Sequence, residues 1–402
     1  MLSRRTFLKT GAASVLAAGA FTNLVSAAAE PAKEGQFIWG NMLNLGHNMW
    51  GDSPTAYTPK SDKLLCQDAI WERLTNEMQA AGLNLLLIDL GEGIQYKSHP
   101  ELAIEGSWSI EKLQKELKRL RGMGIEPIPK LNFSACHDTW LGEYSRMLST
   151  KKYYEVCADL IKEVCEIFDT PRFFHLGYDE ETAGHQSSYE YVVIRQGELW
   201  WHDFLFFVDT VNKQNVRPWI WSDYYWHHAD EFLKRMPKCV LQSNWYYDKE
   251  FDIEKLKTTN EFAAKRVQAY IDFDKAGFDQ VPTGSNWSND VNFGNMVEFC
   301  TKNISKEHLK GFLQTPWHAT VEKSLEHHLK AIAQVKAAKE ALKYSTRSHR
   351  IHKHLSLLTH YEKSYSPFIR AITGAEGSER SARSGRFNYR RTGSTGICYN
   401  VR

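Results

Sequence analysis

Residues 83–90 read Leu-Asn-Leu-Leu-Leu-Ile-Asp-Leu, an apolar run that only one amide and one carboxylate interrupt. A run of this length and character is typical of a strand buried on both faces of a parallel sheet. Seven other short runs recur along the chain at fairly regular intervals, and they are 37–45, 127–133, 173–178, 217–222, 240–245, 280–286 and 311–317. We therefore predict eight strands that lie in one parallel sheet.

Amphipathic helical segments separate these runs. In residues 110–120 the apolar side chains recur at three- and four-residue spacing, and Ser109 stands where a helix cap is expected. Residues 322–342 show a second such stripe. Eight strands, each followed by helical material, within about 300 residues match the size of a (β/α)8 TIM barrel, an α/β fold. A doubly wound open sheet is the alternative, but no GxGxxG turn follows the first run.

Composition limits the class of protein. The 402 residues include 42% hydrophobic and 13% aromatic side chains with 13 Trp, which excludes a disordered, collagen-like or disulfide-scaffold chain. No linker-like segment interrupts residues 36–343, so we predict one barrel domain there, followed by a helical extension at 344–370. The tail at 371–402 is basic and rich in Gly and Ser, and we expect it to be disordered. The net charge of +2 indicates no nucleic-acid partner.

The first 29 residues have the pattern of an export signal. Arg4 and Arg5 precede a weakly apolar Ala- and Gly-rich stretch, which ends in small residues before Glu30. The paired arginines resemble the bacterial twin-arginine signal, which implies a periplasmic or extracellular protein with no stable membrane anchor after signal removal. Seven cysteines without CxxC spacing suit free, mostly buried thiols.

Polar and aromatic residues stand at the ends of the predicted strands. A TIM barrel places its site at the carboxyl ends of its strands, so these side chains are expected to meet. Aromatic faces bind the apolar faces of sugar rings, while amides, imidazoles and carboxylates bind hydroxyl groups, so the set predicts a carbohydrate site. Its members are Asn132, His137, His175, Asp179, Glu180, Trp221, Asp223, Trp245, Tyr246, Trp287 and Trp317.

The adjacent acids Asp179 and Glu180 follow the fourth strand. Ordinary glycosidases use two carboxylates from different strands, whereas two neighbours suit a mechanism in which the substrate's own 2-acetamido group is the nucleophile. One acid then protonates the leaving oxygen, and the other orients the acetamido group. We expect the acid to stay protonated near neutral pH, because an aromatic surround and a like-charged neighbour both raise a carboxyl pKa.

Several short segments resemble a known family in the expected order. Residues 175–180, His-Leu-Gly-Tyr-Asp-Glu, look like the His-x-Gly-Gly-Asp-Glu signature of family 20 glycoside hydrolases, the β-N-acetylhexosaminidases. Residues 128–133 followed by His137 resemble that family's third-strand segment, and 219–223 and 314–317 are looser echoes. The resemblance implies a TIM barrel that acts on 2-acetamido sugars.

The resemblance also implies roles for individual residues. Asp179 would orient and stabilise the acetamido group, Glu180 would be the general acid and then the base, and His137 would support the site. The tryptophans that would wall the acetamido group and the sugar ring are Trp245, Trp287 and Trp317.

The chain also departs from the family pattern. Tyr178 replaces the second glycine, Asn132 replaces an aspartate, and His318 stands where an acid is often found. The first strand lacks the arginine that family members use on sugar hydroxyls. Tyr246 and Tyr247 are the nearby candidates for the family's strand 7 tyrosine.

These observations predict an exported glycoside hydrolase that cleaves terminal β-linked N-acetylhexosamine by substrate-assisted retention. We expect a glycan or oligosaccharide substrate and neither a metal ion nor a cofactor. Two alternatives stay open. Glu180 could act with a nucleophile from another strand, Asp223 or Asp290, or the barrel could be a non-catalytic glycan-binding protein.

Overall fold

A computed structural model describes residues 35–51, 58–187 and 189–344 of the chain. The chain divides into two units, Met1–Leu342 and Lys343–Arg402, and the strands all belong to the first. The predicted export signal at 1–29, the tail at 371–402 and all but the first residue of the predicted extension at 344–370 lie outside the described residues. The predicted domain boundaries therefore stay predictions.

Eight parallel strands form one sheet in the order β6-β5-β4-β3-β2-β1-β8-β7. The strands are β1 (Ile38–Asn44), β2 (Leu85–Asp89), β3 (Glu126–Lys130), β4 (Phe173–His175), β5 (Arg217–Trp221), β6 (Leu241–Ser243), β7 (Thr283–Gly284) and β8 (Gly311–Gln314). Parallel bridges from Gln242 to Gln280 and from Trp245 to Thr283 join the two edges, so the sheet closes into a barrel. The predicted (β/α)8 fold is confirmed, and each strand lies at the run that predicted it.

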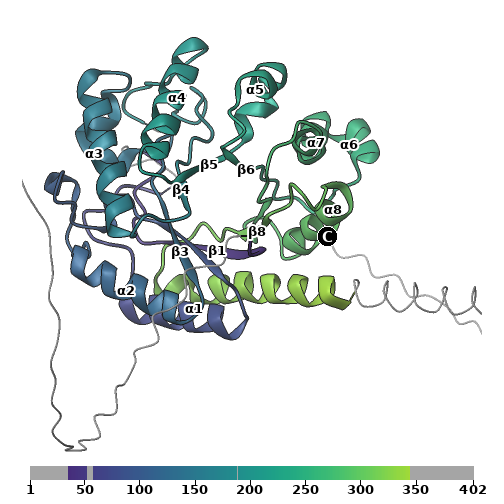
Figure 1. The fold of residues 1–402 in the computed structure, drawn as a ribbon, viewed down its shortest axis with the longest axis horizontal. Helices are drawn as coiled ribbons and strands as arrows, with labels where there is room; N and C mark the ends of the chain where they lie inside the picture. The colour runs from purple at the N-terminus through teal and green to yellow at the C-terminus, as the bar shows by residue number, and fades with distance from the viewer. Residues whose placement is uncertain (1–34, 52–57, 188, 345–402) are drawn as a thin grey trace, which may run out of the picture. The chain divides into compact units, whose positions relative to one another are not determined.

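Helices surround this sheet (Figure 1). They are α1 (Asp68–Ala80), α2 (Ile110–Gly122), α3 (Lys151–Ile167), α4 (Glu198–Asn212), α5 (Ala229–Arg235), α6 (Ile253–Thr259), α7 (Glu261–Lys275), α8 (Asn292–Asn303) and the helical residues 325–344. Short 3-10 helices are η1 (Gly91–Gly93), η2 (Pro100–Leu102), η3 (Thr139–Arg146), η4 (Asp223–Trp226) and η5 (Glu322–Ser324). Ser109 caps α2 by accepting from the Lys112 N–H, as its position predicted. Within the described segments, no helix is long and apolar enough to span a membrane.

The apolar run at β2 contributes side chains to two hydrophobic clusters, one inside the barrel and one between the sheet and the helices. Leu85 and Leu87 belong to a cluster inside the barrel, whereas Leu86 and Ile88 belong to the larger cluster that includes Leu113 of α2. Side chains alternate across a strand, so an uninterrupted run buries both faces. Each such fully buried side chain contributes about 1.5–3 kcal/mol of burial energy. This is why the run determines both the sheet and the helices that cover it.

The cysteines in the described residues are free. Cys239 is exposed, and the buried thiols are Cys66, Cys136, Cys157, Cys165 and Cys300. For this part of the chain, the expectation of mostly buried, unpaired thiols agrees with the structure.

Candidate active site

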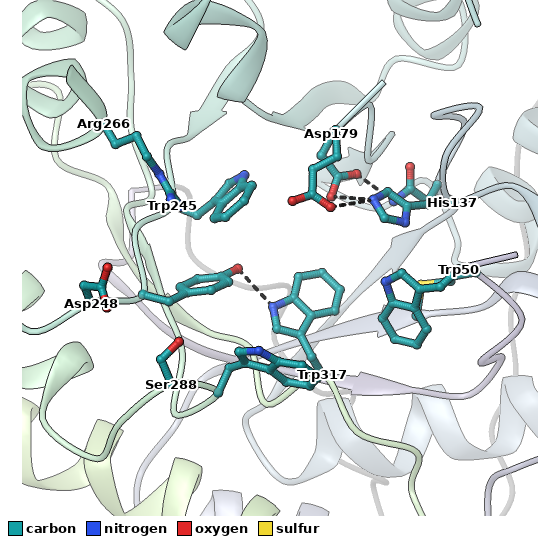
Figure 2. Close-up of a pocket in the computed structure, with 13 residues that line it drawn as sticks. Trp50, His137, Asp179, Trp245, Asp248, Arg266, Ser288 and Trp317 are labelled. Carbon is teal, nitrogen blue, oxygen red and sulfur yellow. Dashed lines mark hydrogen bonds and ion pairs between the residues drawn. The ribbon is translucent and has the colours of Figure 1, made fainter. Parts of the chain in front are cut away.

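A cavity of about 330 Å³ opens at the carboxyl ends of the strands (Figure 2). Asp179 and His137 lie on one side, Arg266 and Asp248 lie on the opposite side, and tryptophans such as Trp50 and Trp317 line the space between them (Figure 2). The residues that line it are Met49, Trp50, Asn132, His137, Asp179, Glu180, Trp245, Tyr247, Asp248, Arg266, Trp287, Ser288 and Trp317. Seven of the eleven predicted site residues therefore meet here, including both members of the predicted acid pair.

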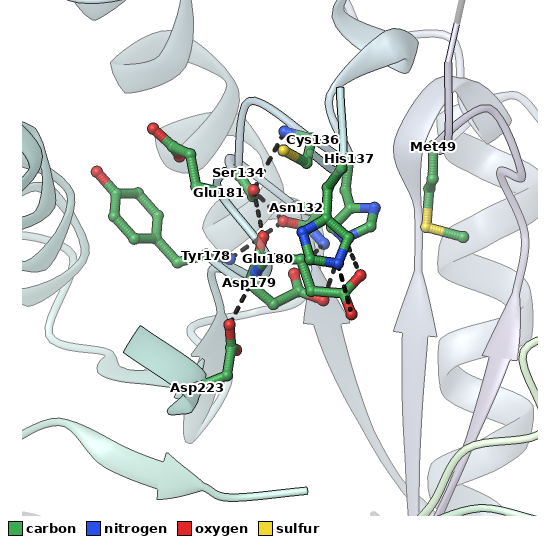
Figure 3. A network of polar contacts seen from close by, with 12 residues as sticks. Met49, Asn132, Ser134, Cys136, His137, Tyr178, Asp179, Glu180, Glu181 and Asp223 are labelled. Atoms are coloured by element: carbon green, nitrogen blue, oxygen red, sulfur yellow. Dashed lines mark hydrogen bonds and ion pairs between the residues drawn. The ribbon is translucent and has the colours of Figure 1, made fainter. Parts of the chain in front are cut away.

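The turn after β4 brings two consecutive acids to one cavity. In an extended strand neighbouring side chains point to opposite faces, so Asp179 and Glu180 could not share a cavity without a change of backbone direction. Three positive φ angles supply it: 68° at Gly177, 74° at Tyr178 and 54° at Glu180. The next acid, Glu181, points away from Asp179 and Glu180 (Figure 3). It binds Arg195 instead.

Packing and hydrogen bonds stabilise the positive φ angles of the turn after β4. A Cβ on Gly177 would lie 2.0 Å from Asn132 Oδ1, so only glycine fits there. Tyr178 has a left-handed conformation that bulky residues avoid. Its N–H donates to Asn132 Oδ1 at 3.1 Å, and its buried ring packs on Phe204 and under the Arg195 guanidinium. Replacement of the family's second glycine is therefore compatible with the turn.

Asp179 is held on both oxygens. Asn132 Nδ2 donates to Oδ1 at 2.8 Å, and His137 Nε2 lies 3.4 Å from Oδ2. The carboxylate is buried, with 6% of the residue exposed. Asn132 Oδ1 in turn accepts from the N–H groups of Ser134 and Tyr178, so the amide links two loops. The asparagine that replaces the family's aspartate is thus the donor that orients Asp179.

Glu180 lies between two histidines. His137 Nε2 is 3.3 Å from Oε2, and His185 Nε2 is 3.5 Å from Oε1. Burial raises the pKa of this carboxyl, but the hydrogen bond with His137 and the positive charges of His137, His185 and Arg266 outweigh this effect, and the pKa lies below its usual value. The expectation of a carboxyl that stays protonated near neutral pH is therefore wrong for the unliganded site.

The pKa of His137 is shifted in the opposite direction, upward. Burial lowers its pKa, but the charges of Asp179 and Glu180 prevail and raise it to about 9. At neutral pH the site therefore contains an imidazolium between two carboxylates. The same three residues could also hold a metal ion, because one ligand atom from each lies within 4.8 Å of the others.

Hydrogen bonds fix the aromatic walls. Trp317 Nε1 donates to the Tyr247 hydroxyl at 2.9 Å, and Trp245 Nε1 donates to Asp223 Oδ1 at 3.2 Å. The rings of Trp245 and Tyr247 lie 5.0 Å apart. Trp287 stands at the mouth, where 39% of the residue is exposed. These rings leave a slot whose apolar faces suit the C–H faces of a sugar.

A buried ion pair lies inside the barrel beneath this slot. The Lys130 ammonium binds Asp89 Oδ2, and both residues are almost fully buried. Lys130 Nζ is 5.8 Å from the Trp317 ring centroid. Burial raises the pKa of Asp89, although Lys130 opposes the shift. The two buried charges of the pair thus satisfy each other inside the barrel.

Four predicted site residues do not line the cavity. His175 and Trp221 lie deeper in the barrel, where their rings pack 4.1 Å apart, and burial holds the pKa of His175 well below its usual value. Asp223 lies behind Glu180, whose N–H donates to its Oδ2 at 2.8 Å. Tyr246 faces the opposite side of its strand end and packs on Phe251.

Three prominent lining residues lie outside the eleven predicted site residues, and one of them, Tyr247, is a candidate that the sequence offered beside Tyr246. Tyr247 is one position beyond Tyr246, and the alternation that places Trp245 inward also places Tyr247 inward, so that signal was present in the sequence. Trp50 follows the first strand and could have been found by its position. Arg266 lies on α7, between strand regions, and no pattern in the sequence indicated that it reaches the cavity.

Comparisons with known proteins bear on the fold. No protein-family profile matches the chain, and no curated protein matches its sequence. Among solved structures it is similar to a mutant Streptomyces plicatus β-hexosaminidase in complex with its product GlcNAc, with a TM-score of 0.51 and 12% identity over 75% of this chain and 64% of that one.

Two further structures are similar at lower TM-scores. A Bacteroides fragilis β-N-acetylhexosaminidase has a TM-score of 0.48 and 12% identity, over 74% of this chain and 66% of that one. A Flavobacterium johnsoniae chitobiase has a TM-score of 0.48 and 16% identity, over 77% and 52%. This chain thus spans less than two thirds of the length of each of the three. At these identities the likeness concerns the barrel fold.

Proposed function

We propose that this chain is a glycoside hydrolase that removes terminal β-linked N-acetylhexosamine by a substrate-assisted, retaining mechanism. One observation carries the proposal: Asp179 and Glu180, consecutive in sequence, line one cavity that four tryptophans also line. The likeness of the barrel to a β-hexosaminidase solved with GlcNAc supports it. We further propose that the protein acts outside the cytoplasm, on the basis of the signal-like residues 1–29.

The geometry suits a nucleophile supplied by the substrate. Asp179, oriented by Asn132 and His137, accepts a hydrogen bond from the acetamido N–H. The Tyr247 hydroxyl accepts from Trp317 Nε1 and lies 3.4 Å from Thr315 Oγ1. In the complex its hydrogen turns from this long contact to the acetamido carbonyl oxygen. These two contacts place that oxygen for attack on the anomeric carbon.

Glu180 donates a proton in the first step of the reaction and accepts one in the second. As the carbonyl oxygen bonds to the anomeric carbon, the glycosidic C–O bond breaks and Glu180 gives its proton to the leaving oxygen. The Glu180 carboxylate then takes a proton from the water that attacks the same carbon. That attack opens the cyclic intermediate and returns the acetamido group, with retained configuration.

Because the pKa of Glu180 is low in the free protein, the mechanism requires that this carboxyl gain a proton before the leaving group departs. The acid must be protonated when the leaving group departs, and contacts with His137 and His185 favour its ionised form in the free protein. Activity is therefore expected to increase as the pH is lowered. Exclusion of water by a bound sugar would raise the same pKa during turnover.

The alternative nucleophiles lack this support. Both Asp223 oxygens accept hydrogen bonds, from the Glu180 N–H and from Trp245 Nε1, and the residue does not line the cavity. Asp290 does not line it either, and Gln334 Nε2 lies 3.4 Å from its Oδ1. A non-catalytic glycan-binding barrel would use the same walls and differs from the proposal in turnover alone.

The test compares aryl β-N-acetylglucosaminide, aryl β-N-acetylgalactosaminide and the plain aryl β-glucoside. The proposal predicts hydrolysis of at least one acetamido substrate, little of the glucoside, and a loss of about a thousandfold or more in kcat for Asp179→Asn. Asp230→Asn changes an exposed acid at the start of α5 and is the matched control. Equal rates on the glucoside would contradict the proposal, and sugar binding without turnover would favour the glycan-binding alternative.

A further inference from the structure

A second cavity of about 730 Å³ adjoins the candidate active site. Glu180, Trp245 and Arg266 line both cavities, so the proposed acid stands at their boundary. A glycosidic oxygen protonated by Glu180 joins the sugar in the first cavity to whatever group leaves. The second cavity is therefore in position to hold the leaving group.

The acids of this second cavity are already compensated. Glu181 pairs with Arg195 at 2.5 Å, and both side chains are almost fully buried. Asp223 accepts two hydrogen bonds, and Glu180 lies beside the imidazolium of His137. The carboxylates on these walls are thus engaged within the protein.

Arg266 differs from these groups, because among the described residues it forms no ion pair, and Glu180 and Asp223 sense its charge only from a greater distance. In the part of the chain that the structure describes, no carboxylate oxygen lies within 4.0 Å of its guanidinium. The group stacks on Trp226 and Trp245, with its central carbon 4.2 and 4.6 Å from the two ring centroids (Figure 2 shows Arg266 beside Trp245). Its Nε is buried without a hydrogen-bond partner, and burial lowers its pKa.

Rings and imidazoles complete the walls. Phe262 is 42% exposed, and the His227 ring stacks on it with centroids 5.2 Å apart. His185 lies next to Glu180 on the same cavity. Aromatic faces suit a sugar ring, and a stacked guanidinium keeps its N–H edge for the oxygen atoms of an anion. The cavity thus combines a ring-binding surface with a cation that forms no ion pair in the described part of the chain.

We propose that the second cavity binds the sugar on the leaving side of the scissile bond, and that this sugar carries an anionic substituent, a carboxylate or a sulfate, which Arg266 recognises. The inference rests on the proposed glycosidase activity, because that activity defines the leaving side. It narrows the substrate class to acidic glycans in which N-acetylhexosamine precedes a charged sugar.

The experiment uses three disaccharides with the same β-linked N-acetylglucosamine and different leaving sugars: glucose, glucuronic acid and glucose 6-sulfate. The wild-type chain should show a kcat/KM at least about tenfold higher for one of the charged substrates than for the neutral one, the gain expected of a charge-assisted hydrogen bond. The favoured substrate identifies the anion as carboxylate or sulfate.

Variants of Arg266 distinguish two roles of this residue: binding the anionic group of the substrate and holding the Trp245 ring in place. Arg266→Gln should remove the preference, so that the charged and neutral disaccharides react alike, and Arg266→Lys should keep part of it. Lys265→Gln, a neighbouring exposed cation on α7, should leave the ratio unchanged. Equal wild-type rates on all three disaccharides would overturn the inference. So would an equal loss on all three in Arg266→Gln, since Arg266 would then serve only to hold Trp245.

A binding measurement keeps the inference distinct from the proposed function. Calorimetry compares methyl β-glucuronide, the 6-sulfate of methyl β-glucoside and methyl β-glucoside itself on the wild type and on Arg266→Gln. Binding of a charged glycoside that Arg266→Gln abolishes supports the acidic site even if no N-acetylhexosaminide is cleaved, in which case the proposed function alone fails. Hydrolysis of aryl N-acetylglucosaminide without any selective binding of a charged glycoside overturns the inference alone.

Discussion

The backbone N–H of Glu180 donates a hydrogen bond to Asp223 Oδ2 at 2.8 Å. The other oxygen of the same carboxylate accepts from Trp245 Nε1. One buried carboxylate, from the loop that follows β5, therefore sets both the backbone of the proposed acid and an aromatic wall. Because Glu180 has a positive φ, its backbone needs such support to stay in place.

Replacement of Asp223 tests this support. Asp223→Ala should lower kcat on N-acetylhexosaminides by about ten- to a hundredfold with a smaller change in KM, because misplacement of an acid slows the chemical step more than binding. Asp223→Asn should retain more activity, since its amide oxygen can still accept from Glu180. A loss of about ten thousandfold or more that azide restores would identify Asp223 as a nucleophile and contradict the positioning role.

The pH dependence of activity tests the contact between His137 and Glu180. Burial raises the pKa of Glu180, but the two histidines lower it overall, so kcat/KM should rise as the pH falls. His137→Asn removes one positive neighbour and should raise the Glu180 pKa. The alkaline limb of the pH profile, along which activity falls as Glu180 loses its proton, should therefore move to higher pH, whatever the change in maximal rate. A limb that stays in place or moves lower would show that His137 does not control this carboxyl.

The same imidazole links stability to pH. Its folded pKa of about 9 exceeds the ordinary value of 6.5, so its stabilising contribution is complete below pH 6.5 and is lost as the pH rises through 9. The free energy of unfolding should fall by roughly 1–3 kcal/mol over this interval, since one pKa unit corresponds to about 1.4 kcal/mol. Urea titrations at several pH values measure the fall. His137→Asn should show a flatter profile, and an equal fall in the variant would assign the effect to other groups.

The ion pair under the cavity predicts a non-additive effect of mutations. Lys130→Met leaves Asp89 buried without its cation and should destabilise the protein by about 3–5 kcal/mol. Adding Asp89→Leu removes the stranded carboxylate and should recover much of that loss. Denaturant unfolding of the two single variants and the double variant gives the coupling energy. Additive losses would mean that the pair is not coupled.

The barrel was predictable because its strands are buried on two faces. The run at 83–90 supplies Leu85 and Leu87 to the inner cluster and Leu86 and Ile88 to the outer one, and a strand of a half-exposed sheet would have alternated. The acid pair was predictable for a different reason. Its residues follow a strand directly, where a TIM barrel places its site.

The remaining features of the site depend on contacts between distant segments. Arg266 reaches both cavities from α7, and helical periodicity says only which side of a helix faces inward. The low pKa of Glu180 results mainly from His137, which the loop after β3 brings to it, and from His185 further along its own loop, whereas local sequence suggested the opposite shift. The choice between Tyr246 and Tyr247 could have been made by continuing the strand alternation from Trp245.

The most direct measurement of the central claim varies the nucleophile itself. Aryl N-acetylglucosaminides with zero, one, two and three fluorine atoms on the acetyl group are compared by kcat/KM. Fluorine withdraws electrons from the carbonyl oxygen, so a mechanism in which that oxygen attacks the anomeric carbon predicts a steep, progressive fall along the series. Rates that stay nearly constant would contradict substrate assistance and indicate a nucleophile from the protein.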